Sequence, residues 1–212
     1  MTVRALSDWP GDDGQAEGTP AARAAEATRR RLTPKQAAIV DRIVDAAEDE
    51  ARRGGYDATT VRGAARCAGV APATAYTYFA SKDHLLAEVL WRKMADLPEV
   101  THAPGANSLD RVAAELRALS LFVSDDSQLA AACTSALLGS GPEVRALRVR
   151  FGAEVHRRLG GALGDGCDPA VLAALDLAYS GAMLWSGLGH IAFADLPRAL
   201  GDVARALLEG TP

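Results

Sequence analysis

The residues best suited to chemistry lie between positions 60 and 82, where hydroxyl, phenol and ammonium groups recur every few residues. Small and hydroxyl-bearing side chains fit against base edges in the DNA major groove, and tyrosines reach phosphate oxygens. Ser81 is a typical helix N-cap and Lys82 follows in the first turn, so free backbone N–H groups and an ammonium would form a phosphate site. These residue types at this spacing favour binding to duplex DNA.

Two short helices across a glycine turn are needed to position these groups. Thr60 is a good N-cap for the first helix, whose apolar residues recur at three- and four-residue steps as far as Gly69. Gly69 suits the left-handed residue that ends a helix, and Pro72 suits the first turn of the next one. This arrangement is typical of a helix-turn-helix, with Ala75 and Phe79 facing inward. The residues predicted to face outward are Ala73, Thr74, Tyr76 and Thr77.

The stretch over residues 69–86, Gly-Val-Ala-Pro-Ala-Thr-Ala-Tyr-Thr-Tyr-Phe-Ala-Ser-Lys-Asp-His-Leu-Leu, resembles the signature of TetR-like bacterial transcriptional regulators. The resemblance covers residues 33–97, under a third of the chain. It implies a three-helix DNA-binding domain, followed by a helical domain that binds a small effector and pairs with a second copy. Two positions depart from the family pattern, because Ala71 replaces a Ser or Thr and Gly63 replaces a polar or charged residue. The predicted DNA-binding residues are Thr60, Arg62, Pro72, Ala73, Thr74, Tyr76, Thr77, Tyr78 and Lys82.

The alternative for this stretch is a helical hairpin that binds no DNA, since such hairpins also occur as plain supersecondary motifs. The distribution of charge favours DNA binding. The chain carries a net charge of −4, yet residues 21–95 hold 13 basic and 9 acidic side chains, a net charge of +4. The acidic excess lies outside this region, so the positive surface coincides with the helix-turn-helix, as a phosphate-facing surface requires.

The chain of 212 residues is long enough for one or two domains with a core. No stretch resembles a transmembrane span or a secretory signal, so we expect a cytoplasmic protein without a membrane partner. Its cysteines (Cys67, Cys133 and Cys167) have neither the spacing of a zinc site nor that of a disulfide framework, and its histidines are dispersed. Phosphate-loop and nucleophile-elbow motifs are absent. We therefore expect no metal, no cofactor and no enzymatic activity.

Three regions are predicted along the chain. Residues 1–32 form a flexible tail, and its arginine run at 29–31 is either a solvated charge run or an arm that touches DNA. The helix-turn-helix domain occupies 33–80. Its first helix begins with the capping box Thr33-Pro34-Lys35-Gln36 and is expected over 34–53, with Gly54-Gly55 ending it. Residues 81–212 form the effector-binding and dimerisation domain.

Helical periodicity without any strand pattern predicts an all-α fold of about nine helices. Beyond the helix-turn-helix, helices are expected over 81–97, 108–124, 125–138, 142–159 and 168–188, and from 195 onward. The helix at 81–97 begins at the DNA-facing unit and ends in the next domain. It is therefore the element that could carry a signal between the two.

The last two expected helices carry apolar residues over more than one stripe, a face wider than a monomer core requires. The resemblance implies that they pair with the same helices of a second copy, and closure of a monomeric core is the alternative. A two-fold dimer would place two recognition helices in successive major grooves, about 34 Å apart. The predicted interface residues are Leu175, Tyr179 and Met183.

The C-terminal region mixes small residues with aromatic and sulfur-containing ones, a composition that either lines an apolar cavity or fills an ordinary core. The resemblance favours the cavity. Few charged residues fall at inward positions, so an apolar or amphipathic effector is expected. The predicted lining residues are Trp91, Met94, Phe122, Cys133, Phe151 and Trp185.

These predictions describe a ligand-responsive, homodimeric repressor that binds a palindromic operator. The effector would favour a conformation whose recognition helices are wrongly spaced for the operator. One alternative is an all-helical enzyme or binding protein with an incidental helix-turn-helix, and another is a TetR-like activator.

Overall fold

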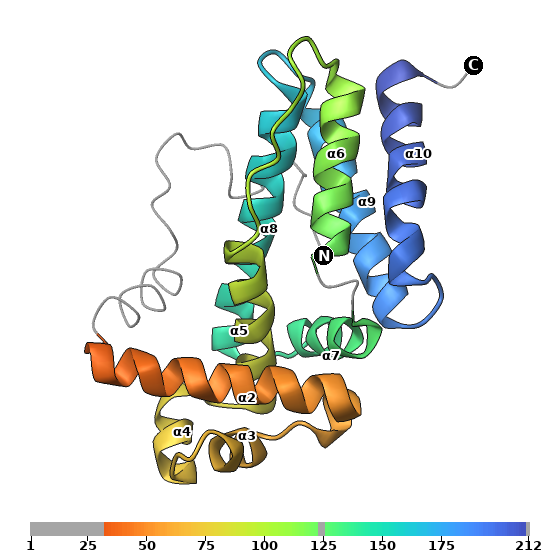
Figure 1. Ribbon diagram of the computed structural model, residues 1–212. Helices are drawn as coiled ribbons and strands as arrows, with labels where there is room; N and C mark the ends of the chain where they lie inside the picture. Colours follow the sequence, from red (N-terminus) through yellow and green to blue (C-terminus); the bar gives the residue numbers. More distant parts are fainter. Residues whose placement is uncertain (1–31, 123–125, 211–212) are drawn as a thin grey trace, which may run out of the picture.

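The computed structural model describes residues 32–122 and 126–210. Within these ranges the chain forms nine α-helices and one short 3-10 helix, without a strand, which confirms the predicted all-α fold (Figure 1). The predicted tail at 1–32, including the arginine run, lies outside the described residues except for its last position. The elements are α2 (Pro34–Ala58), α3 (Val61–Cys67), α4 (Pro72–Tyr78), α5 (Lys82–Ala95), α6 (Ser108–Leu121), α7 (Ser127–Leu137), α8 (Pro142–Leu163), α9 (Pro169–Gly187), η2 (Phe193–Asp195) and α10 (Leu196–Glu209).

The capping box at the start of α2 forms as predicted. The Thr33 hydroxyl accepts from the Gln36 N–H at 3.3 Å, and the Gln36 side chain accepts from the Thr33 N–H at 2.9 Å. The helix does not end at Gly54-Gly55, however. It kinks at Gly55, whose φ of 68° is not helical, and then resumes as far as Ala58. The extra turn places Tyr56 beside the start of α5, which matters for the site below.

Helices α3 and α4 lie beneath α2, and α5 rises from this group into the rest of the molecule (Figure 1). The Ser81 hydroxyl accepts from the His84 N–H at 3.0 Å and so caps α5 as predicted. Helix α5 packs against α2, α7 and α8. Its buried face includes Leu85, Leu86 and Met94. This continuous helix therefore joins the two parts of the fold.

Above α2, the helices α6, α8, α9 and α10 stand side by side, while α7 lies across their lower ends (Figure 1). Helix α8 was expected to stop at residue 159, but it continues through Gly160 and Gly161 to Leu163. Arg111 of α6 explains the extension, because its guanidinium donates to the carbonyls of Ala162 at 2.7 Å and Leu163 at 3.0 Å. These bonds satisfy acceptors that a helix end leaves unpaired.

Candidate nucleic-acid interface

Helices α3 and α4 form the predicted helix-turn-helix, and local signals build both. The Thr60 hydroxyl accepts from the Gly63 N–H at 2.9 Å and caps α3. Gly69 adopts a φ of +65°, which an L side chain rarely adopts, and so makes the turn into α4. The sides of α3 and α4 that face the domain core carry alanines, and Ala64 and Ala75 are fully buried. Small side chains at this crossing let the two short helices approach closely.

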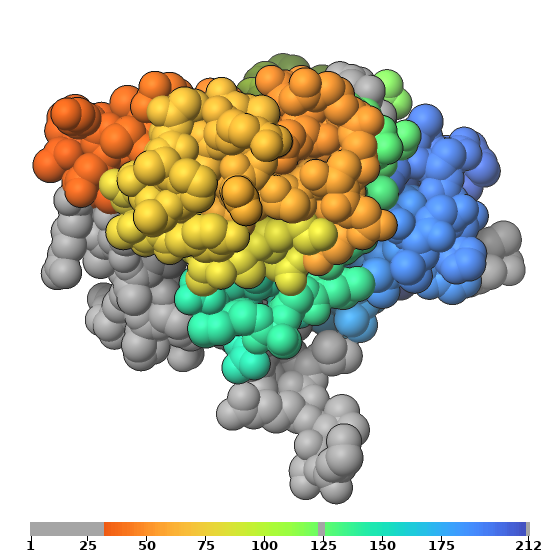
Figure 2. All heavy atoms as spheres, turned by 90° about the horizontal axis from the view of Figure 1, so that it is seen from below, coloured from red at the N-terminus to blue at the C-terminus, as the bar shows by residue number. Residues whose placement is uncertain are grey.

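The outer face of α4 is left to solvent. Pro72, Ala73, Tyr76 and Thr77 are exposed, with 55% of Tyr76 accessible, while Thr74 is half-buried. The Thr77 hydroxyl donates to the Ala73 carbonyl at 3.1 Å, so it lies along the helix rather than reaching outward. Figure 2 looks onto this side of the molecule, where α3 and α4 lie foremost in orange and yellow. The geometry presents a short helix whose outer residues are small or carry hydroxyl groups, which suits contact with a DNA groove.

The other predicted contact residues surround α4 but differ in how they are held. Arg62 on α3 is exposed, and the Thr60 hydroxyl is engaged in the helix cap. Tyr78 is half-buried and packs against the core. Lys82 stands in the first turn of α5 as predicted, and its ammonium contacts a residue outside the predicted set.

That residue is Tyr56, at the kinked end of α2. The Lys82 Nζ lies 3.6 Å from the centroid of the Tyr56 ring and donates to the Tyr56 carbonyl oxygen at 3.1 Å. The Tyr56 hydroxyl in turn donates to the carboxylate of Asp83. This hydrogen bond, together with burial, raises the pKa of Tyr56 to about 12, so the phenol stays protonated and remains a donor. A contact over 26 positions leaves no periodic signal in the sequence.

The structure shows the consequence of each departure from the family pattern. Ala71 leaves α4 without a side-chain cap. A Cβ atom built on Gly63 would lie 2.5 Å from Oε1 of Glu50, so the missing side chain makes room for that carboxylate. Glu50 then accepts from the Thr60 N–H at 3.4 Å and ties α2 to the start of α3. Gly63 therefore serves close packing within the domain.

The six residues predicted to line an effector pocket differ in their burial. Trp91, Met94 and Cys133 are buried in the core, and burial raises the pKa of the Cys133 thiol to about 12. The rings of Phe122 and Phe151 lie 6.2 Å apart between the end of α6 and α8. Trp185 on α9 is 57% exposed, and its ring lies beside His190.

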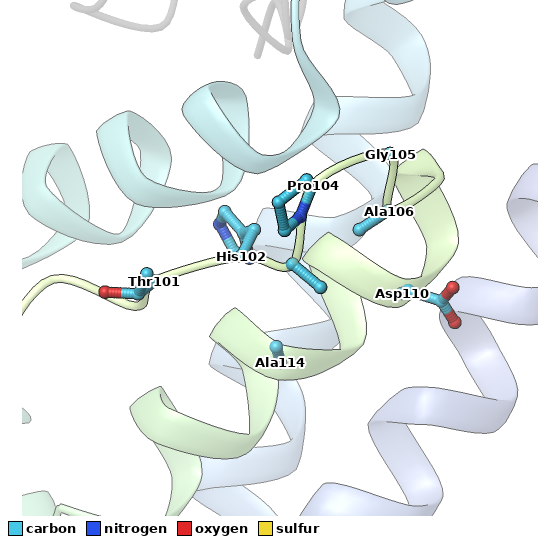
Figure 3. Close-up of a pocket in the computed structure, with 8 residues that line it drawn as sticks. Thr101, His102, Pro104, Gly105, Ala106, Asp110 and Ala114 are labelled. Carbon is cyan, nitrogen blue, oxygen red and sulfur yellow. The ribbon is translucent and has the colours of Figure 1, made fainter.

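A surface hollow of about 470 Å³ opens between the 101–106 segment and α6 (Figure 3). None of the predicted pocket residues lines it. One of its lining residues is His102, whose Nε2 lies 4.0 Å from the buried carboxylate of Glu115. Its lining residues are Thr101, His102, Ala103, Pro104, Gly105, Ala106, Asp110 and Ala114. Over the described residues, no group of three or more metal-ligating side chains is assembled.

The three predicted interface residues also lie elsewhere than expected. Leu175, Tyr179 and Met183 point into the protomer's own core, so their side chains are not available to a partner. The large apolar residues that α9 and the loop after it leave exposed are Leu177, Trp185 and Leu188.

By length and composition alone α9 could cross a membrane, contrary to our expectation from the sequence. Only 22% of its apolar stretch is buried within the protomer.

Comparisons with known proteins agree with this geometry. The sequence model of the family described as "Bacterial regulatory proteins, tetR family" matches residues 43–89, from α2 to α5. Over 188 residues the chain is 43% identical to the HTH-type transcriptional regulator Rv0767c from Mycobacterium tuberculosis, covering 88% of this chain and 87% of the relative. It is also 37% identical over 98 residues to the HTH-type transcriptional repressor KstR from Rhodococcus jostii, covering 46% of each chain.

Solved structures share the fold at low sequence identity. A TetR transcriptional regulator from Rhodococcus sp. RHA1 superimposes with a TM-score of 0.66 at 20% identity, covering 85% of this chain and all of that one. The regulator FadR from Bacillus subtilis, solved in complex with stearoyl-CoA, superimposes with a TM-score of 0.54 at 19% identity, covering 81% of this chain and 98% of that one. Because its helix-turn-helix matches the family model and a relative is 43% identical over 87% of that relative's length, the chain belongs to the TetR family of bacterial transcriptional regulators.

Proposed function

We propose that this DNA-binding regulator is a homodimeric repressor whose two α4 helices enter successive major grooves of a palindromic operator. The observation that carries the proposal is the exposed face of α4, with the Lys82 ammonium beside it at the start of α5. Bases would meet Ala73, Tyr76 and Thr77, while phosphates would meet Lys82 and Arg62. The name of KstR, a transcriptional repressor, supports repression over activation.

The dimer surface in this proposal is the apolar face shared by α9 and α10. These helices pack on each other and lie together at one side of the molecule (Figure 1). Leu177 and Trp185 of α9, with Leu188 after it, are exposed, and so are Val203 and Leu207 of α10. A second copy would cover both helices at once, in an isologous four-helix contact. This contact also explains why the most apolar helix is so little buried in a single protomer.

An apolar or amphipathic effector is proposed to bind within the C-terminal domain, around Trp91, Met94, Phe122, Cys133 and Phe151. The FadR structure, solved with stearoyl-CoA, supports this class of ligand. A second support is the indole Nε1 of Trp91, which is buried and has no hydrogen-bond partner among the described residues. The polar end of an amphipathic ligand could accept from it, which would remove the cost of an unpaired buried donor. Arg150 lies 4.0 Å above the same ring and adds a positive charge nearby.

The route from effector to DNA in this proposal is α5. Trp91 and Met94 lie near one end of this helix and Lys82 opens the other, so a tilt of α5 would move the phosphate contact. Typical couplings of about 1–3 kcal/mol are enough to change operator affinity by one or two orders of magnitude.

Operator binding is tested with DNA from upstream of the chain's own gene, by titration of the purified protein at several salt concentrations. We expect saturable binding to a pseudo-palindromic site. Lys82→Ala should weaken binding to all sequences alike and lower the slope of log K against log salt by about 0.9, as expected for the loss of one phosphate contact. Lys93→Ala, on the same helix but bound to Glu48 at 2.7 Å, is the matched control. Equal salt slopes for Lys82→Ala and the wild type would contradict the role of Lys82.

A further inference from the structure

The contact between Tyr56 and Lys82 joins two elements of the DNA-facing unit. The ammonium is held from two directions, by the ring at 3.6 Å and by the Tyr56 carbonyl oxygen at 3.1 Å. Such an arrangement combines a cation–π contact with a charge-assisted hydrogen bond. Lys82 nevertheless remains half-exposed, so the contact holds the ammonium without closing it off from solvent.

The backbone of α2 is shaped so that Tyr56 reaches this position. Gly55 has a φ of 68° and a ψ of −163°, and the helix kinks there immediately before Tyr56. A side chain at Gly55 would be strained at this φ, so the position favours glycine. The kink therefore turns both the ring and the carbonyl of Tyr56 toward the start of α5.

Asp83 holds the ring from its far end. It accepts the Tyr56 hydroxyl proton, and its own side chain packs against the corner between α7 and α8. A Cβ atom built on Gly139 at that corner would lie 2.8 Å from Oδ2 of Asp83. The ring is therefore fixed by its backbone, its hydroxyl group and the neighbouring domain.

A lysine side chain carries about 2 kcal/mol of rotamer entropy, part of which is lost when a free ammonium binds a phosphate. An ammonium already held in place has lost that freedom before DNA arrives. It has three N–H donors, and Tyr56 uses one of them. Two remain for a phosphate at the start of α5, where the first-turn N–H groups of the helix also point.

We infer that Tyr56 is a positioning residue for DNA binding: it holds the ammonium of Lys82 in place before a backbone phosphate arrives. This inference rests on the proposed role of Lys82 as a phosphate contact. Tyr56 itself touches no DNA in this arrangement. Its effect on affinity acts entirely through Lys82.

The first test uses the DNA-free wild-type protein. The chain contains three lysines, Lys35, Lys82 and Lys93, so reductive methylation with ¹³C-formaldehyde gives few lysine signals in an NMR spectrum. A group held above an aromatic ring is shifted upfield by the ring current. We expect one shifted signal, lost in Lys82→Arg and moved to the ordinary lysine position in Tyr56→Leu. A wild-type spectrum without a shifted signal overturns the inference.

The second test is a double-mutant cycle on operator affinity. Tyr56→Leu should weaken binding by about 2- to 5-fold, the value of a partly exposed cation–π contact. In a Lys82→Ala background the same substitution should have no effect. Tyr56→Phe keeps the ring and the carbonyl, so it should restore most of the affinity that Tyr56→Leu loses. Circular dichroism and thermal unfolding check that each variant is folded.

The outcomes separate this inference from the proposed function. If Tyr56→Leu weakens binding equally with and without Lys82, Tyr56 acts on the fold and the inference is overturned. The same holds if Tyr56→Phe loses as much affinity as Tyr56→Leu, because the hydroxyl bond to Asp83 would then be the active part. If the wild-type protein binds no operator, the proposed function fails, and the lysine spectrum still decides whether Tyr56 holds the ammonium.

Discussion

The hydroxyl of Tyr179 on α9 donates a hydrogen bond of 2.9 Å to the main-chain carbonyl of Leu119 on α6. Tyr179 is only 2% exposed, and burial raises its pKa well above the usual range. Its ring therefore belongs to the protomer, together with Leu175 and Met183 on the same side of α9. The apolar residues Leu177 and Trp185, on the other side of the helix, are exposed.

Tyr179→Phe should lower the free energy of unfolding without changing the oligomeric state. The substitution removes the hydrogen bond to the Leu119 carbonyl, at a cost of about 1–3 kcal/mol. Denaturant unfolding measures the loss of stability, and light scattering measures the mass. A fall in mass would place Tyr179 at the interface after all.

Leu177→Glu should have the opposite effect. Leu177 is exposed on the outer face of α9, so a carboxylate there costs little in a single protomer. In a dimer it would be buried without a partner, which is strongly unfavourable. We expect the mass to fall from twice the chain mass to the chain mass, with helicity retained. A mass unchanged at micromolar concentration would show that this face is not the interface.

Gly63→Ala should destabilise the DNA-binding domain although alanine is the better helix former. The propensity gain is roughly 1 kcal/mol in a helix interior. Against it stands the contact with Glu50, whose carboxylate oxygens lie 2.5 and 2.7 Å from the added Cβ atom. Such overpacking typically lowers the stability of the folded state by about 1–3 kcal/mol, because neighbouring side chains must shift. The net effect should therefore be a lower unfolding midpoint.

Gly161→Ala is the matched control, because it lies within α8 and its Cβ atom would meet open space. It should stabilise the protein by about 0.5–1 kcal/mol. Adding Glu50→Ala to Gly63→Ala should relieve the crowding and recover part of the loss. If Gly63→Ala alone raises the midpoint, Glu50 moves aside freely and the proposed packing role is wrong.

The sequence predicted those features whose signals lie within a few residues of the structure they specify. The capping box at Thr33, the cap at Ser81 and the turn at Gly69 all formed as predicted. The inward and outward sides of α4 were also predicted correctly, because Ala75 and Phe79 are buried while Tyr76 is exposed. Each of these signals acts over about one helical turn, so one or two residues are enough to specify the local structure.

Features that depend on distant partners could not be predicted in this way. Arg111 reaches the end of α8 from 51 residues away and extends it beyond its glycines. On α9 apolar residues lie on both sides, so the pattern did not show which side the protomer buries. Trp185 was predicted to line an internal effector pocket, and it is exposed. The bond from Lys82 to Tyr56 likewise depends on the kink at Gly55, which the sequence suggested only as a helix end.

Arg158→Met should lower stability most strongly at neutral and higher pH. Arg158 is 3% exposed, its Nη1 lies 3.4 Å from Oε2 of the buried Glu115, and Nη2 donates to the Pro98 carbonyl at 3.2 Å. Burial already raises the pKa of Glu115, while Arg158 opposes that rise. Removing the arginine takes the guanidinium partner from a buried carboxylate, at a cost of about 3–5 kcal/mol.

The sign of the pH dependence follows from Glu115. Without Arg158 the folded-state pKa of Glu115 rises further above its unfolded value, so the stability cost is complete above the folded pKa. It shrinks as the pH falls through that pKa, because the carboxyl group becomes neutral. The stability that Arg158→Met loses, relative to the wild type, should therefore become smaller on acidification. Adding Glu115→Gln should remove most of this pH dependence, and a pH-independent loss in Arg158→Met alone would contradict the account.

The fluorescence of Trp91 should change when an effector binds, while that of the exposed Trp185 should not. The chain has three tryptophans: Trp9 lies outside the described residues, Trp91 is buried beside Arg150, and Trp185 is exposed on α9. In a Trp9→Phe/Trp185→Phe variant, stearoyl-CoA bound near Trp91 should change the emission saturably. Operator affinity should fall over the same concentration range, since an effector shifts the equilibrium only by its differential affinity for the two states. In Trp91→Phe the emission should stay constant.

If neither stearoyl-CoA nor a panel of fatty acids and other apolar metabolites changes the emission of Trp91, the proposed effector site is wrong. Repression would then be set by the abundance of the protein or by a protein partner.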